Sequence, residues 1–276
     1  MIRKNFTFVI TTFRSGAVID ECLKDMPKDI RKIIVENSND HNLKDRLENM
    51  YENTECFLMS DNLGYGKAHN IAMRKSIENN TSYHIVLNPD IYFENDVIEK
   101  LYNYMEENQE IGNIIPQVLY PDGEIQYLTK LLPTPIDLIF RRFIPLKSWK
   151  DKRNKKFELK FTGYKDINNI PSLSGCFMFL RADTLKDVGL FDENIFMYLE
   201  DTDLNRRIHS KYKTIFYPKV HILHEYAKES YVNKKLLVYH IKSAIYYFNK
   251  WGWFFDKERA EINNRCLEKL NYKKEN

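Results

Sequence analysis

Long apolar runs, clustered cysteines and a strong excess of one charge are all missing from this sequence. No apolar stretch approaches the roughly 20 residues that a membrane-spanning helix needs. The cysteines are Cys22, Cys56, Cys176 and Cys266. They lack metal-ligand spacing, which favours a reduced compartment over a disulfide framework. The net charge of +3 excludes a nucleic-acid footprint over the whole chain. Because no signal peptide precedes the first strand pattern, we expect a cytoplasmic protein.

The composition fits one large α/β domain, alone or with an appendage. The 276 residues are 43% hydrophobic, enough for a sizeable core. The aromatic content of 14% suits a core, a membrane-surface belt or a sugar-binding cleft. Residues 141–160 carry nine Lys or Arg against two acids. This basic segment is either a solvated loop or a contact for anionic headgroups or a diphosphate-linked acceptor.

Apolar strand patterns alternate with helical patterns along the chain. Strands are predicted at residues 6–10, 31–35, 56–59, 84–87, 174–180 and 214–217, and helices at 17–26, 43–52, 67–79, 97–107, 201–210 and 233–251. Polar residues follow the strands, which predicts a doubly wound, mostly parallel sheet with its site at the strands' carboxyl ends. Residues 113–123 suggest a hairpin-like excursion. Residues 130–170 suggest an irregular, mobile or acceptor-side loop.

Asn88-Pro89-Asp90 directly follows one of these predicted strands. A hard divalent cation prefers oxygen ligands, and needs few from the protein when a diphosphate supplies others. Pro89 fixes the local backbone and so aims the Asp90 carboxylate. An acid at a strand end also forms turns and caps helices. The motif therefore indicates either a metal ligand or a turn.

Three acids gather where another helix is predicted to begin: Glu200, Asp201 and Asp203. Acids in this position cap a helix and interact favourably with its dipole, which explains them without any chemistry. A carboxylate there can also accept a proton from a hydroxyl group as a general base. The residues alone leave both interpretations open.

Two weaker signals complete the set. His221 and His224 are ordinary histidines unless a partner stands nearby, but with Asp90 as that partner His224 becomes a candidate second metal ligand. Residues 61–70, Asp-Asn-Leu-Gly-Tyr-Gly-Lys-Ala-His-Asn, lie where a strand turns into a helix. Glycines there let the backbone approach a ligand, and a helix N-terminus favours phosphate. The segment is no GxGxxG fingerprint.

Taken in order, these segments resemble glycosyltransferase family 2, and more narrowly its rhamnosyltransferase-like branch of bacterial O-antigen, capsule and polysaccharide synthesis. The resemblance spans about residues 5–230. Its motifs are Thr-Thr-Phe, Val-Glu-Asn-Ser, Asn-Leu-Gly-Tyr-Gly-Lys-Ala-His-Asn, Leu-Asn-Pro-Asp, Ser-Gly-Cys-Phe-Met-Phe-Leu-Arg, Val-Gly-Leu-Phe-Asp-Glu with Tyr-Leu-Glu-Asp-Thr-Asp-Leu, and His-Glu-Tyr-Ala-Lys-Glu-Ser. It implies the GT-A fold, a Rossmann-like, mostly parallel sheet flanked by helices, over residues 1–230. A helical extension, membrane- or acceptor-facing as one alternative, would follow at 231–276.

The resemblance also implies roles for individual residues. Asp90 corresponds to the last acid of the family's Asp-x-Asp metal motif, and Asn88 stands where many members have an acid. The implied metal is Mg²⁺ or Mn²⁺, with His224 as a second ligand, and Asp201 corresponds to the catalytic base. The residues assigned to the donor are Thr11, Thr12, Phe13, Glu36, Asn62, Gly64, Lys67, Asn88 and Asp90. Those assigned to the acceptor side are Gly175, Cys176 and Glu200.

The implied reaction is an inverting transfer from a nucleotide-sugar, with dTDP-L-rhamnose as first choice and UDP-hexose or UDP-N-acetylhexosamine as alternatives. A metal on Asp90 would stabilise the leaving diphosphate, while Asp201 deprotonates the acceptor hydroxyl. One base is enough, because a phosphate leaving group needs no carboxylic acid to protonate it. The expected acceptor is a glycan or a lipid-linked saccharide, with contact to the inner membrane surface left open.

Two other functions compete with this one. A sugar-nucleotide pyrophosphorylase would need a Gly-rich, basic loop after the first strand, but residues 11–16 contain one glycine. A non-catalytic nucleotide- or carbohydrate-binding protein would have no need of both Asp90 and Asp201. Residues 239–255 mix lysine with aromatic side chains, so they predict a helix that either packs on the domain or lies on a membrane surface.

Overall fold

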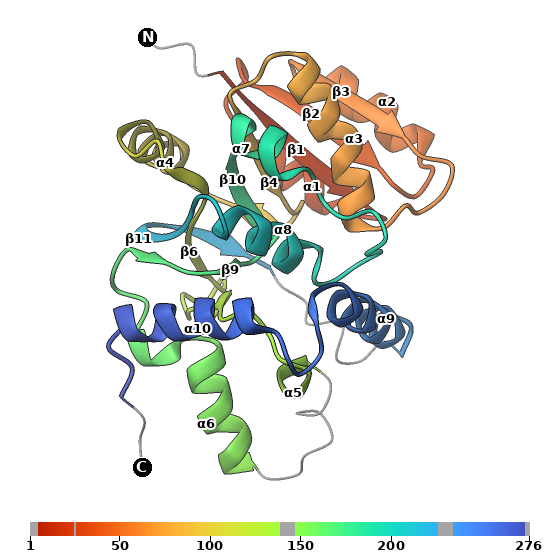
Figure 1. The fold of residues 1–276 in the computed structure, drawn as a ribbon. Helices are drawn as coiled ribbons and strands as arrows, with labels where there is room; N and C mark the ends of the chain where they lie inside the picture. The colour runs from red at the N-terminus through yellow and green to blue at the C-terminus, as the bar shows by residue number, and fades with distance from the viewer. Residues whose placement is uncertain (1–4, 25, 139–146, 226–233, 274–276) are drawn as a thin grey trace.

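The computed structural model describes residues 5–24, 26–138, 147–225 and 234–273 (Figure 1). Its main sheet has the order β3-β2-β1-β4-β10-β6-β11-β5, with β8 beside β11. The strands are β1 (Phe6–Thr12), β2 (Arg31–Glu36), β3 (Thr54–Leu58), β4 (Tyr83–Leu87), β5 (Ile91–Tyr92), β6 (Ile111–Leu119), β8 (Asn168–Asn169), β10 (Phe177–Arg181) and β11 (Lys213–His224). A separate two-stranded sheet pairs β7 (Thr129–Lys130) with β9 (Ser172–Leu173).

The first four strands of the sheet order run parallel, as predicted. β10 enters antiparallel between β4 and β6, and β11 then runs parallel to β6. Parallel neighbours bring their carboxyl ends to one edge, so the polar segments after β1, β2 and β4 meet there. The predicted α/β fold with a large, mostly parallel sheet is confirmed.

Helices cover both faces of the sheet because its strands bury side chains on both sides. On β1, Phe8 and Ile10 face one core and Val9 faces the other, as strand alternation requires. The first core is covered by α1 (Val18–Lys24), α2 (His41–Met50) and α4 (Asn95–Glu107). The second is covered by α3 (Tyr65–Glu78), α7 (Ala182–Val188) and α8 (Glu200–His209).

Two predicted segments are wrong in part. Residues 130–170 are not simply irregular, because they contain α5 (Pro135–Leu138), α6 (Lys147–Phe157), the 3₁₀ turn η2 (Lys160–Thr162) and β8. Residues 111–119 are a central strand, and only the tip beyond it folds back, through a bridge between Leu119 and Ile125. The strand predicted at 214–217 continues through a register shift at Pro218 as far as His224.

The C-terminal part forms α9 (Lys234–Trp251) and α10 (Lys257–Lys269), which lie below the sheet in Figure 1. α9 joins Leu199, at the start of α8, in a small core with Ala244, Tyr247 and Phe248. The predicted boundary at residue 230 lies outside the described residues. Within the described residues, no helix is long and apolar enough to cross a bilayer.

Candidate functional site

The ends of β4 and β11 meet at the sheet's carboxyl edge. His224, the last residue of β11, pairs with Ile91 of β5, and the backbone N–H of Glu225 donates to the Asp90 carbonyl at 3.1 Å. This pairing sets His224 Nε2 3.4 Å from Asp90 Oδ1. Asn88 Nδ2 lies 3.5 Å from the same ring nitrogen. The structure therefore brings together the three residues predicted for the metal side.

Gln126, which the sequence analysis missed, orients the imidazole ring of His224. Gln126 Oε1 lies 3.0 Å from His224 Nδ1, and Gln126 Nε2 donates to the His224 carbonyl at 2.7 Å. When Nδ1 carries the proton and donates to Gln126, Nε2 presents a lone pair on the side of Asp90. His221 is exposed on the strand's other face. Only one of the two predicted histidines thus reaches the site.

Asp90 and His224 fit a divalent cation as two neighbouring ligands. Adjacent ligands at about 2.1 Å from a six-coordinate Mg²⁺ lie about 3 Å apart, close to the spacing of these two side chains. Among the residues that the structure describes, no group of three His, Cys, Asp or Glu side chains could hold a metal ion. A cation here would therefore depend on further oxygen ligands, such as those of a bound diphosphate.

Asp201 lies in the first turn of α8 and is held by two backbone amides. Its Oδ2 accepts a hydrogen bond from Gly175 N at 2.9 Å, and its Oδ1 accepts one from Thr202 N at 2.6 Å. Tyr198 and Leu199, just before the helix, both have left-handed backbones, with φ of 69° and 71°. Such strain in two non-glycine residues is typical of functional sites. The turn directs the Asp201 side chain toward Gly175.

The Gly175-Cys176 segment joins the metal side to Asp201. Asn88 N–H donates to the Cys176 carbonyl at 2.9 Å, while the Gly175 amide bonds to Asp201. A Cβ on Gly175 would stand 3.1 Å from the Asp201 Cβ, so a side chain there would crowd the carboxylate. The Tyr65 hydroxyl donates to the Gly175 carbonyl at 2.6 Å. Burial, followed by the nearby acids, raises the pKa of Tyr65 well above its usual value, so the hydroxyl remains a donor.

Burial opposes ionisation of two acidic groups at this segment, Cys176 within it and Glu200 next to Asp201. Burial and the neighbouring Asp201 raise the pKa of Glu200 well above its usual value. Glu200 Oε2 is buried and has no hydrogen-bond partner among the described residues. Burial also raises the pKa of the Cys176 thiol to about 12. Of these two predicted acceptor-side residues, Glu200 therefore offers a polar group that a bound hydroxyl could satisfy.

Gly64 allows a close backbone contact beside the site, which the sequence did not reveal. Its φ is +83°, and a Cβ there would lie 2.1 Å from the Phe196 carbonyl oxygen. The next residue, Tyr65, donates its backbone N–H to that carbonyl at 2.8 Å. Gly64 thus allows the strand-to-helix turn to pack against the segment that leads into α8. Asn62 accepts hydrogen bonds from Asn37 Nδ2 and Gly64 N, which fixes the same turn.

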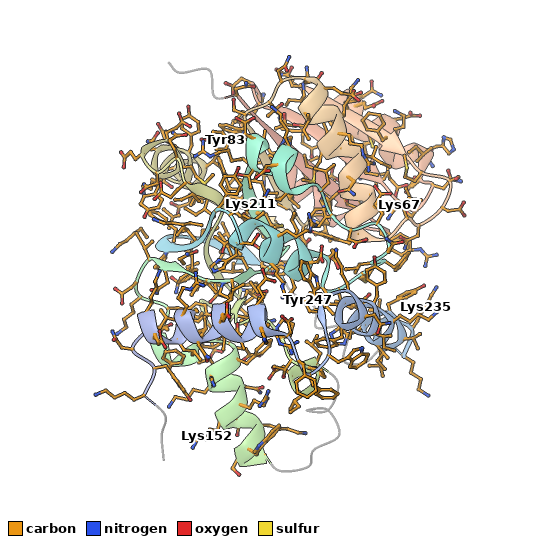
Figure 2. The ribbon with its side chains drawn as sticks, viewed as in Figure 1. Lys67, Tyr83, Lys152, Lys211, Lys235 and Tyr247 are labelled. Carbon is orange, nitrogen blue, oxygen red and sulfur yellow. The ribbon has the colours of Figure 1, made fainter. Side chains whose placement is uncertain are left out.

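The predicted donor residues lie around the ends of β1 and β2. Thr12 pairs with Glu36 in the sheet, and the buried hydroxyls of Thr11 and Thr12 have no partner among the described residues. Phe13 is exposed, as is Lys67 in the first turn of α3, which Figure 2 labels. A polar hollow of about 540 Å³ opens beside these strand ends, lined by Arg14, Gly16, Ser38, Asn39, Asp40, His41 and Asn42. It is large enough for part of a nucleotide.

Glu36 is the predicted donor residue whose surroundings differ most from expectation. Its carboxylate accepts hydrogen bonds from Ser38 N at 3.0 Å and Asp40 N at 2.7 Å, and a further one from the Ser38 hydroxyl. The side chain is fully buried. Glu36 therefore shapes the loop that lines the hollow, and direct contact with a base or ribose would compete with these bonds.

Sequence comparison identifies the relatives of this chain. The family model "Glycosyl transferase family 2" matches residues 7–189. Two Mycobacterium tuberculosis strains, CDC 1551 / Oshkosh and ATCC 25618 / H37Rv, each have an N-acetylglucosaminyl-diphospho-decaprenol L-rhamnosyltransferase 27% identical to this chain over 196 residues. The match covers 64% of this chain and 60% of each relative.

Solved structures share the fold at low sequence identity. Staphylococcus aureus TarS, residues 1–349, is 16% identical with a TM-score of 0.56, and the match covers 95% of this chain and 72% of that one. GalNAc-T7, solved with UDP, GalNAc and Mn²⁺, is 16% identical with a TM-score of 0.56, covering 80% and 44%. These likenesses support the GT-A fold. The family model covers the strands from β1 to β10, with Asp90 and Gly175, whereas Asp201 and His224 lie beyond its last matched residue. The chain belongs to glycosyltransferase family 2.

Proposed function

We propose that the chain is a metal-dependent, inverting glycosyltransferase that moves a sugar from a nucleotide-sugar to a hydroxyl of a lipid-linked glycan in bacterial surface polysaccharide synthesis. The observation that carries this proposal is that the Gly175-Cys176 segment bonds to Asn88, beside Asp90 and His224, on one side and to Asp201 on the other. A candidate metal side and a candidate base are thus fixed to one short piece of backbone. A binding protein would have no need of this arrangement.

Each residue has a proposed role in the reaction. Asp90 and His224 would hold Mg²⁺ or Mn²⁺, and the cation would offset the charge that builds on the leaving diphosphate. Asp201 accepts the proton of the acceptor hydroxyl. Because that hydroxyl attacks opposite the leaving group and no second nucleophile intervenes, the anomeric configuration inverts. Glu200, being neutral, donates or accepts a hydrogen bond on the acceptor side.

The first-choice donor is dTDP-L-rhamnose, supported by the names of the two mycobacterial relatives. A second candidate is UDP-N-acetylhexosamine or UDP-hexose, supported by the structure of TarS in complex with UDP-GlcNAc, 15% identical to this chain with a TM-score of 0.54. The relatives' names also support a polyprenyl-diphosphate-linked acceptor. Such an acceptor would place the enzyme in the cytoplasm, at the inner face of the membrane.

A panel of dTDP-, UDP- and GDP-sugars tests this proposal. Nucleoside-diphosphate release would be measured with Mg²⁺, with Mn²⁺ and with chelator, and the product's anomeric configuration would be read by NMR. Turnover of dTDP-L-rhamnose with inversion and metal dependence would support the whole proposal. Turnover of a UDP-sugar would replace the donor and keep the mechanism. If the protein neither bound nor turned over any donor, that result would contradict the proposal.

A further inference from the structure

The helix α9 has one face that packs on the domain. Ala244, Tyr247 and Phe248 are buried against Leu199, and the Ser243 hydroxyl donates to the Met197 carbonyl at 2.7 Å. In Figure 2, Tyr247 lies on the inner side of α9 toward α8, whereas Lys235 lies on the outer side. The helix is therefore anchored, and its opposite face is available for another role.

That opposite face carries a stripe of exposed aliphatic side chains. Val238 is 49% exposed, Ile241 36% and Ile245 41%. Their spacing of three and four residues puts them on one side of the helix. Phe254 and Phe255, in the turn after α9, are 62% and 99% exposed. Of the seven large exposed hydrophobic side chains among the described residues, five thus lie between 238 and 255. Apolar side chains concentrated in this way mark an interaction surface.

The charged residues that α9 itself contributes are all cations. α9 contains no Asp or Glu, and Lys234 and Lys242 are exposed on its outer side. Lys250 does not belong to this surface, because it forms ion pairs with Asp192 and Asp203 on the packed side. The outer face therefore combines an apolar stripe with flanking cations, the composition of a helix that lies in a membrane interface.

We infer that the outer face of α9, with Phe254 and Phe255, binds the surface of a bilayer that contains anionic lipid. Lysines near such a surface are attracted to its negative charge, and the aliphatic side chains add the burial of their exposed area. A second copy of the chain is a poorer occupant. A two-fold contact between the α9 helices through this face would bring its lysines together with no acid of α9 to pair with them, and like charges across an interface oppose association.

This surface lies close to the candidate base. Phe196 stacks on Tyr239 with ring centroids 4.5 Å apart, and Tyr198 contacts His240 at 5.4 Å. The segment that carries these two residues leads directly to Asp201. Because a helix is about 10 Å across, a bilayer on the outer side of α9 would lie about one helix diameter from this segment. A diphosphate-linked acceptor in that bilayer could then present its sugar to Asp201. This role of the surface rests on the proposed function.

Vesicle co-sedimentation of the full chain tests the inference without donor or acceptor. We expect binding to phosphatidylcholine vesicles that contain phosphatidylglycerol, weaker binding to phosphatidylcholine alone, and release at high salt. The variant Val238→Ser/Ile241→Ser/Ile245→Ser should lower the partition coefficient by about tenfold or more, because three partly exposed aliphatic side chains are lost. Lys234→Glu/Lys242→Glu should abolish the preference for anionic vesicles.

Matched controls place the same changes elsewhere on the surface. Met50→Ser on α2 removes an exposed apolar side chain, and Lys28→Glu/Lys165→Glu reverses two exposed charges. Both controls should bind vesicles as the wild type does. Three results would each overturn the inference: the serine variant binds vesicles as the wild type does, no vesicle is bound at all, or the protein is a dimer that the serine changes dissociate.

Nucleoside-diphosphate release with a soluble acceptor, measured on the same variants, separates failure of the membrane inference from failure of the proposed function. If turnover persists while vesicle binding fails, only the membrane inference falls; vesicle binding without turnover of any donor would count against the proposed function alone.

Discussion

Gln126 is a neutral side chain that positions His224, a residue of the candidate metal site. It is buried, and it contacts His224 both through the ring nitrogen Nδ1 and through the backbone carbonyl. Outer-shell partners of this kind fix the tautomer and orientation of a metal-binding histidine. The residue lies 98 positions from His224 in the sequence, so only the folded chain reveals the contact.

The change Gln126→Ala should weaken Mn²⁺ binding about 10- to 100-fold, because the His224 ring loses its partner. Calorimetry with Mn²⁺ in the presence of nucleoside diphosphate measures this directly and needs no turnover. The matched control is Gln117→Ala, since Gln117 faces the exposed His221 on the same two strands. Equal Mn²⁺ affinity in the Gln126 variant and the wild type would contradict the positioning role.

Glu200 makes the stability of the protein depend on pH. Its pKa is raised in the folded protein, so the folded state holds its proton more tightly than the unfolded chain does. Below the ordinary pKa of 4.5 the group is protonated in both states and costs nothing. As pH rises above that value, the unfolded chain ionises first, and the free energy of unfolding falls by about 1.4 kcal/mol per pH unit until the folded-state pKa is reached.

Replacing Glu200 by Gln removes the carboxyl group whose ionisation causes this pH dependence. Glu200→Gln should therefore be more stable than the wild type at pH 7 to 8, and the difference should vanish near pH 4. Urea unfolding across this pH range checks the prediction. A difference that stays constant with pH would mean that Glu200 is not held neutral in the folded protein.

Among the elements, α8 connects the candidate base to the C-terminal helices. Arg206, on the buried side of α8, forms a two-pronged ion pair with Asp256 at 2.7 and 2.9 Å. It also reaches Glu258 at 2.7 Å and lies over the Trp251 ring at 4.1 Å. Asp256 in turn caps α10 by accepting from Arg259 N. The extension is therefore tied to the helix whose first turn carries Asp201.

The change Arg206→Met should cost about 3–5 kcal/mol of unfolding free energy, because the buried Asp256 carboxylate loses both guanidinium hydrogen bonds and keeps only Arg259, whose guanidinium is 3.8 Å away. Urea unfolding gives the magnitude, and limited proteolysis should show earlier cleavage around α10. Lys211→Met, which breaks an ion pair between the more exposed side chains of Lys211 and Asp187, should lower the free energy of unfolding far less, because water screens that pair. Similar losses in the two variants would remove the distinction between buried and surface ion pairs here.

The elements also show which patterns the sequence reveals. β1, β2 and β4 each contain three consecutive apolar residues, Phe8-Val9-Ile10, Ile33-Ile34-Val35 and Ile85-Val86-Leu87, so their positions and the polar residues behind them could be predicted. α6 could not, because its residues are almost all charged or polar and only Phe157 is buried. Pro218 made the last strand seem to end early, whereas β11 absorbs it in a register shift and continues to His224.

For the whole molecule, order along the chain predicted the fold and the neighbourhood of the site, but not its detailed contacts. Asp90 and His224 meet only because β11 crosses to the edge of the sheet and pairs with β5. Glu36 was predicted to contact the nucleotide, and its engagement with its own loop depends on backbone geometry that no pattern encodes. The assigned roles of these residues in binding and catalysis stay predictions.

The proposed function assigns Asp201 to proton transfer and Asp90 to metal binding, and one paired measurement separates the two roles. Donor affinity by calorimetry and the turnover number would be determined for wild type, Asp201→Asn, Asp90→Ala and the surface control Asp45→Asn. We predict that Asp201→Asn binds the donor normally and loses about 10²- to 10⁴-fold in kcat. Asp90→Ala should lose Mn²⁺-dependent donor affinity as well, and Asp45→Asn should match the wild type. Wild-type turnover by Asp201→Asn would contradict the role of Asp201 as the catalytic base.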